Sequence, residues 1–347
     1  MALRSRDFRI YSAARLLGIM GAEAQSVGVA WQVYQITHSA LALGYTGLAL
    51  FLPGLCFVLP AGHVADRYDR RAVIMCCYTV QAVATAWLLW LSLNGAPLVY
   101  CFTLAMLVTF LALFAFIHPR GAGEKKGFTV ETMLAGLRYV IGTRLLLGSI
   151  SLDLFAVLLG GAVSLMPIFA SEVLHEGANG LGLLRAMPSM GALAVSLTLL
   201  VLPLRRRAGK TMLLCVGLFG AATVVFGLSR NLLLSCVALV IIGATDMVSV
   251  VVRSSILQLA TPPAMRGRVS SINWLFLGAS NELGEYESGL TAHWWGAVRA
   301  VVIGGVASMA VTGGWSVFFP ALRHADRLSA EDLIELERQF SSMEPVG

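Results

Sequence analysis

The chain has 347 residues, of which 57% are hydrophobic and only 13% carry a charge, and its mean hydropathy is +0.78. Soluble globular domains carry about 25% charged residues, so this composition excludes an ordinary soluble domain and indicates a protein that lies in a lipid bilayer. The formal net charge is +6, and the positions of the basic residues explain it without an acidic partner.

A membrane helix needs about 20 mostly apolar residues, and ten such runs follow one another along the chain. They cover residues 10–36, 42–65, 72–94, 97–118, 146–171, 180–203, 211–229, 231–259, 269–292 and 300–320. The sequence therefore predicts an all-α, polytopic membrane protein with ten transmembrane helices, four before a polar connector and six after it.

The polar connector covers residues 119–145 and divides the chain into an N-terminal half, 1–118, and a C-terminal half, 146–320, followed by a tail, 321–347. Inside the connector, apolar residues recur at helical spacing and predict an amphipathic helix on the inner membrane surface: Val130, Met133, Leu134, Leu137 and Ile141. Capping-box spacing of Ser329 and Asp332 predicts a short helix in the tail.

The basic residues set the orientation. With the N-terminus inside, 20 of the 25 Lys and Arg residues fall in inner segments, and only Arg230 and Arg299 fall outside. Lys and Arg near helix ends resist translocation, so both termini are expected to be cytoplasmic. The positive net charge is thus explained mostly by the membrane topology, and it does not indicate a nucleic-acid partner.

The loop after the second run carries the most informative motif, in which Gly62 is followed by Asp66, Arg67, Arg70 and Arg71. This spacing resembles the signature loop between the second and third helices of the major facilitator superfamily of secondary transporters. Further blocks resemble the branch that contains the enterobactin exporter and related bacterial efflux proteins: residues 8–9, 29–34, 151–156, 182–186, 266–269 and 280–289.

The resemblance implies a twelve-helix fold in two six-helix halves, a place in the bacterial inner membrane, a small-molecule substrate and no cofactor. The N-terminal half has only four runs, so the simplest interpretation is that the fourth and fifth helices of the family are absent. The run that begins at residues 96–100 could correspond to either the fourth or the sixth family helix.

In the family, the signature acid and arginines make charge contacts that stabilise one alternating-access state. The resemblance implies that Asp66 and Arg67 make these contacts in this chain. Arg70 and Arg71 would then face lipid phosphates or take part in the same charge contacts. The alternative is a loop that serves only to anchor the topology.

Ionisable and polar residues inside the runs are costly and are functional candidates by default. They are Glu23, Gln25, Asp153, Asp246, Arg253, Asn281, Glu282 and Glu285. One interpretation is that they carry a coupling proton or line a substrate cavity. The other is an internal polar network in which Asp246 or the glutamates pair with Arg15, Arg185 or Arg253.

No P-loop, metalloprotease motif or nucleophile–base pair is present in the sequence, and the six cysteines lie in or beside apolar runs without metal-ligand spacing. We therefore expect neither an enzyme nor a metal site. The leading hypothesis is a permease that exports a siderophore or a hydrophobic drug by proton-coupled alternating access. The second is a shortened relative that does not transport and acts as a membrane interaction protein or survives as a remnant.

Overall fold

The computed structural model describes residues 6–49, 51–52, 79, 83, 86–87, 90, 130–202, 204, 207–263, 265–325, 332, 335–336 and 339, except for the side chains of residues 6–19, 22 and 130–133. All regular elements in this part of the chain are helices. The all-α prediction is therefore confirmed for the described residues.

The described part of the first half consists of a long helix and a short one. Helix α1, Arg6–Thr37, ends at a turn where His38 has a positive φ of 46°, and a second helix, Ala40–Ala49, follows. The first expected span matches α1. The signature loop and most of the second, third and fourth expected spans lie outside the described residues.

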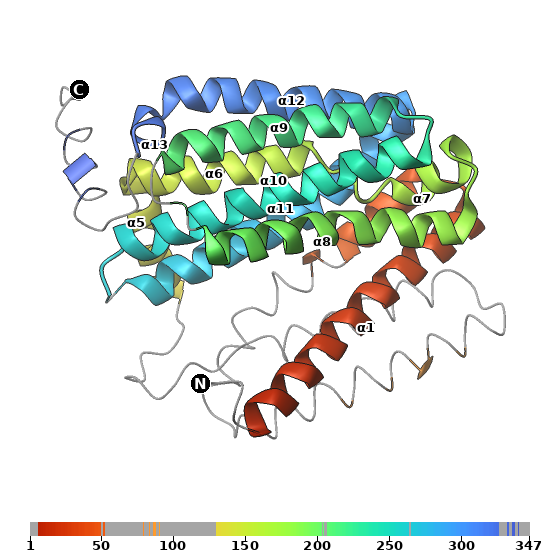
Figure 1. The fold of residues 1–347 in the computed structure, drawn as a ribbon, viewed down its shortest axis with the longest axis horizontal. Coiled ribbons are helices and arrows are strands. Elements are labelled where there is room, and N and C mark those ends of the chain that lie inside the picture. Colours follow the sequence, from red (N-terminus) through yellow and green to blue (C-terminus); the bar gives the residue numbers. More distant parts are fainter. Residues whose placement is uncertain are drawn as a thin grey trace.

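The second half forms a bundle of long helices lying side by side (Figure 1). Its elements are α5, Val130–Gly142; α6, Arg144–Leu159; α7, Met166–Ile168; a π-helix, Phe169–Val173; α8, Gly177–Val201; α9, Ala208–Leu228; α10, Leu232–Ala260; α11, Arg266–Trp295; α12, Ala297–Phe318; and α13, Pro320–Arg323. Helix α10 packs against α8 and α9, α9 packs against α12, and α11 packs against α6.

Among the described residues, four helices are long and apolar enough to cross a membrane, namely α8, α9, α10 and α12. The pair α5 and α6 would add a fifth span if it were counted as one, but it bends by 102° at Thr143. Helices α1 and α11 are longer still, with 32 and 30 residues, and both carry several charged residues along their length. Each of the last five expected spans corresponds to one helix.

The expected span 146–171 is wrong as a continuous helix. Helix α6 ends at Leu159, and the chain turns through Gly160 and Gly161 before α7 and the π-helix. A Cβ atom at Gly160 would lie 2.6 Å from the Phe219 ring, so the turn is held close to α9 and only glycine fits there.

The crossing of α8 and α10 also depends on glycine. A Cβ at Gly191 would lie 2.0 Å from the carbonyl oxygen of Val240, and one at Gly243 would lie 1.9 Å from that of Pro188. Small residues let helix backbones approach closely. In lipid, this close van der Waals packing drives helix association, because burial of apolar surface gives no advantage there. The outer faces of these helices remain apolar and exposed, as at Leu193, 60% exposed.

Two clusters of buried side chains lie at opposite ends of the bundle. One joins Tyr34 of α1 with Phe169 and Phe226. The other joins α5, the start of α9 and α13, where the Gly209 amide donates a hydrogen bond to the Ala325 carbonyl at 2.9 Å. Helices α5 and α13 lie at the same end (Figure 1), which is the end that the distribution of basic residues predicts to face the cytoplasm. We call it the inner end and the opposite end the outer end.

Candidate functional site

The predicted polar residues fall into two groups. Asp153, Asp246 and Arg253 come together inside the second half, whereas Glu282 and Glu285 lie where the second half meets the first. The loop residues Gly62, Asp66, Arg67, Arg70 and Arg71 are outside the described part of the chain, and so their roles stay predictions.

A buried ion pair joins α6 to α10. The Arg253 guanidinium donates to the Asp153 carboxylate, and the two side chains are 2% and 3% exposed. The sequence left open whether Arg253 would pair with Asp246 or with the glutamates, and the structure pairs it with Asp153, which lies 100 residues earlier on another helix. A charge in the bundle interior is tolerated because the opposite charge is in direct contact.

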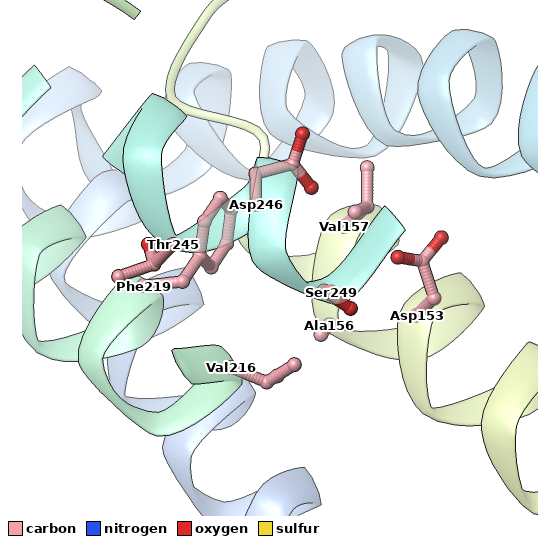
Figure 2. Close-up of a pocket in the computed structure, with 8 residues that line it drawn as sticks. All are labelled: Asp153, Ala156, Val157, Val216, Phe219, Thr245, Asp246 and Ser249. Atoms are coloured by element: carbon pink, nitrogen blue, oxygen red, sulfur yellow. The ribbon is translucent and has the colours of Figure 1, made fainter. Parts of the chain in front are cut away.

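Asp246 lies beside this ion pair, at a small cavity between α6, α9 and α10 (Figure 2). The cavity is lined by Asp153, Ala156, Val157, Val216, Phe219, Thr245, Asp246 and Ser249 and has a volume of about 10 Å³. The Ser249 hydroxyl is buried at the cavity and interacts with the Asp153 carboxylate. The site therefore combines two carboxylates with a buried hydroxyl around a space the size of one water molecule.

The second group lies at the junction of the two halves. Glu285 of α11 is within electrostatic range of Arg185 on α8 and Glu23 on α1, and Glu282 interacts with Glu285 in the same way. Glu23 is exposed and Gln25 is half-buried. One oxygen of Glu282 and the Nε of Arg185 are buried without a hydrogen-bond partner among the described residues. Three carboxylates and one guanidinium thus share this region.

Glycine at position 47 allows the helix Ala40–Ala49 to rest directly on these acids. A Cβ at Gly47 would lie 2.6 Å from the Cβ of Glu285 and 2.7 Å from the Glu282 carbonyl oxygen. One turn earlier, Gly44 approaches Gly289 with the same closeness. The first half therefore covers α11 from Glu282 outward.

The same face of α11 is uncovered toward the inner end. Asn281, Gly278 and Trp274 precede Glu285 by whole numbers of helical turns, so they lie on its face. All three are exposed, and Trp274 is 69% exposed. In the described structure, this face of α11 is therefore covered at Glu285 and exposed at Asn281, Gly278 and Trp274.

At the outer end the two halves are joined by a hydrogen bond that the sequence did not suggest. The Tyr34 hydroxyl of α1 donates to the Glu172 carboxylate of the π-helix, and Tyr34 is 2% exposed. Beside it, Phe169 stacks on Phe226 with ring centroids 4.7 Å apart. In the sequence, Tyr34 is one of several aromatic residues in the apolar runs, and nothing marks it as a contact between the halves. No sequence pattern predicted the π-helix.

Comparison with known proteins agrees with this architecture. Residues 1–112 match the family model MFS_3, described as transmembrane secretion effector. Of the 15 solved chains that match, one is the crystal structure of a mutant of the nucleoside transporter NupG, with a TM-score of 0.57 and 12% identity over 86% of this chain and 95% of that one. No curated protein matches. The chain thus has the fold of a multi-pass membrane transporter.

Proposed function

We propose that the chain belongs to the major facilitator superfamily and is a secondary active transporter that exports a small organic molecule by proton-coupled alternating access. The observation that carries this proposal is the uneven contact between the two halves in the part of the chain that the structure describes. They touch at the outer end through Tyr34 and Glu172 and through Gly47, while the α11 face at Trp274 is exposed toward the inner end. This is the arrangement expected of a transporter open to the inside.

The acids of α11 support a role in contacting substrate. Glu282 retains a buried oxygen without a hydrogen-bond partner in the described region, and a polar group left unpaired at membrane depth is costly unless it serves a ligand or a proton. Together with Asn281 and Trp274 on the same face, these acids suit a molecule that combines polar groups with an apolar or aromatic surface. A siderophore or a hydrophobic drug is therefore the proposed substrate class.

The proposal also assigns a role to the signature loop on the inner side of the membrane. Asp66 and Arg67 are proposed to make the charge contacts that stabilise one access state, with Arg70 and Arg71 beside them. We also place the chain in the bacterial inner membrane with both termini in the cytoplasm, on the strength of the 20-to-2 distribution of basic residues. Neither a cofactor nor a catalytic role is required.

Reconstitution tests the proposed activity. The full chain is purified, placed in proteoliposomes and loaded with a siderophore or a hydrophobic dye, with and without a pH gradient. We expect movement of the substrate that depends on the gradient, is abolished by a protonophore and is lost in Glu285→Gln. Glu176→Gln is the matched control, because Glu176 is exposed at the outer end before α8. Transport that ignores the gradient would refute proton coupling, and no transport of any compound would favour the shortened, inactive relative.

A further inference from the structure

Helix α5 lies across the inner end of the bundle (Figure 1). It bends by 102° from α6 at Thr143. The Tyr139 hydroxyl donates a hydrogen bond to the Ala260 carbonyl of α10 at 3.2 Å, and a Cβ atom at Gly136 would lie 3.1 Å from the backbone of Arg268 on α11. Because α6 runs along the bundle (Figure 1), a helix bent from it by about a right angle runs close to the plane of the membrane surface.

One edge of α5 is apolar and largely uncovered by the residues that the structure describes. Leu134 and Ile141 are 52% and 57% exposed, and their spacing of seven residues places them on one side of the helix. Gly136 and Val140 lie on a different side, which packs on the protein, and Val140 is only 1% exposed. An exposed apolar edge is unfavourable in water, but it suits the boundary between lipid headgroups and acyl chains, where amphipathic helices lie.

A basic residue lies on the same edge. Arg138 follows Leu134 by four residues and precedes Ile141 by three, so the three residues form one stripe, which we call the α5 edge. The Arg138 side chain is exposed and makes no hydrogen bond or ion pair with another described residue. A long basic side chain can lay its apolar stem against acyl chains and place its guanidinium among lipid phosphates, which it binds through two parallel hydrogen bonds.

The charge of the segment around α5 favours an anionic lipid over a neutral one. Residues 119–145 contain five Lys and Arg and two Glu, which gives this segment a net charge of +3. Basic groups are attracted to an anionic membrane surface when they lie within a Debye length of it, about 8 Å at physiological ionic strength. A zwitterionic headgroup carries its own cation beside the phosphate, so it offers Arg138 no net negative charge.

We propose that the α5 edge lies in the leaflet at the inner end and binds an anionic phospholipid. Leu134 and Ile141 enter the boundary with the acyl chains, and the Arg138 guanidinium binds the lipid phosphate. The proposal is independent of transport, because it needs only the membrane-protein fold. It also gives the lipid a place of action, since α5 packs on the first turn of α11, the helix that carries Glu282 and Glu285.

Photocrosslinking of the full chain in lipid nanodiscs tests this contact directly. The photoreactive residue p-benzoylphenylalanine is placed at Leu134, at Ile141 or, as a control, at Leu193, which is 60% exposed on α8. The nanodiscs consist of phosphatidylcholine with a small fraction of alkyne-tagged phosphatidylglycerol or, separately, of alkyne-tagged phosphatidylcholine. We expect adducts with phosphatidylglycerol to exceed those with phosphatidylcholine by about fivefold at Leu134 and Ile141. At Leu193 the two yields should be equal, because acyl chains of either lipid meet this position.

The variant Arg138→Gln identifies the group that recognises the headgroup. It should remove the preference for phosphatidylglycerol at Leu134 and Ile141 and leave the yields at Leu193 unchanged. Arg323→Gln is the matched control, because it removes another exposed positive charge at the inner end, on α13. This control variant should keep the preference.

Two results would overturn the proposal. Absence of lipid adducts at Leu134 and Ile141, while Leu193 forms them, would mean that the α5 edge faces water or protein. Equal yields with the two lipids, or a preference that survives Arg138→Gln, would leave Arg138 as a topology anchor only. Neither result bears on transport, so failure of this proposal and failure of the proposed function are distinguishable.

Discussion

Removal of one partner of the Asp153–Arg253 pair is expected to destabilise the protein strongly. In Asp153→Asn the side-chain volume is nearly unchanged, so the loss is electrostatic. Both side chains are almost fully buried, at 2% and 3% exposure, and the Arg253 Nε already has no hydrogen-bond partner in the described structure. Breaking a buried pair by removing one charge costs about 3–5 kcal/mol. This corresponds to a roughly 10²- to 10⁴-fold lower ratio of folded to unfolded protein.

The matched control neutralises both partners. Replacement of a buried ion pair by uncharged residues of similar volume is often neutral or stabilising, so Asp153→Asn combined with Arg253→Met should recover most of the lost stability. The circular-dichroism signal of the helices reports unfolding, because all regular elements in the described part of the chain are helices. Unfolding is then followed against temperature in detergent for the parent, the single variant and the double variant.

Two outcomes would refute this reasoning. If Asp153→Asn unfolds at the temperature of the parent, the pair does not stabilise the fold. If the double variant is as unstable as the single one, the cost arises from packing at Asp153 and not from an unpaired buried charge.

Four further predictions test the junction of the halves and the topology. Tyr34→Phe removes a hydrogen bond to a carboxylate worth about 1.5–3 kcal/mol, so spin-label distances across the outer end should lengthen; unchanged distances would contradict the role of this contact. Gly47→Ala places a methyl group 2.6 Å from Glu285 and should cost about 1–3 kcal/mol, whereas Gly28→Ala, with no atom within 4 Å, should cost little; equal effects would argue against close packing on α11. Asp66→Asn should reduce transport more than protein abundance, and normal transport would exclude the gating role. Glu176→Cys should react with an impermeant thiol reagent only from outside, and labelling from the cytoplasm would reverse the topology.

The helices of the second half could be predicted from sequence because each is a long apolar run bounded by polar residues. The runs 180–203 and 211–229 correspond to α8 and α9 within a few residues. The paired glycines at 160 and 161 indicate a point of flexibility but do not predict a break after Leu159, because such pairs also occur in helices that continue. Gly304 and Gly305 do so inside α12, where the helix is unbroken.

The candidate site was only partly predictable for a different reason. Each polar residue at membrane depth stands out in the sequence, so Asp153, Asp246 and Arg253 were all recognised. Their partners are set by which helices are neighbours, and one sequence has no signal for a contact between residues 100 positions apart. The pairing of Tyr34 with Glu172 and the contact of Gly47 with Glu285 were missed for the same reason.

Helix α1 is long, and its contact with Glu172 lies close to one end, so a rotation of the helix about this contact would move the other end much further. With 32 residues, the helix is about 48 Å long at 1.5 Å per residue, and the hydrogen bond of Tyr34 is only one turn from its outer end. A rotation of about 10° around this point would move the opposite end, about 42 Å away, by roughly 7 Å, given the same helical rise. In such a rotation the first helix would act as a lever arm, in which a displacement of just under 1 Å at the short outer arm becomes an opening wide enough for a small organic molecule.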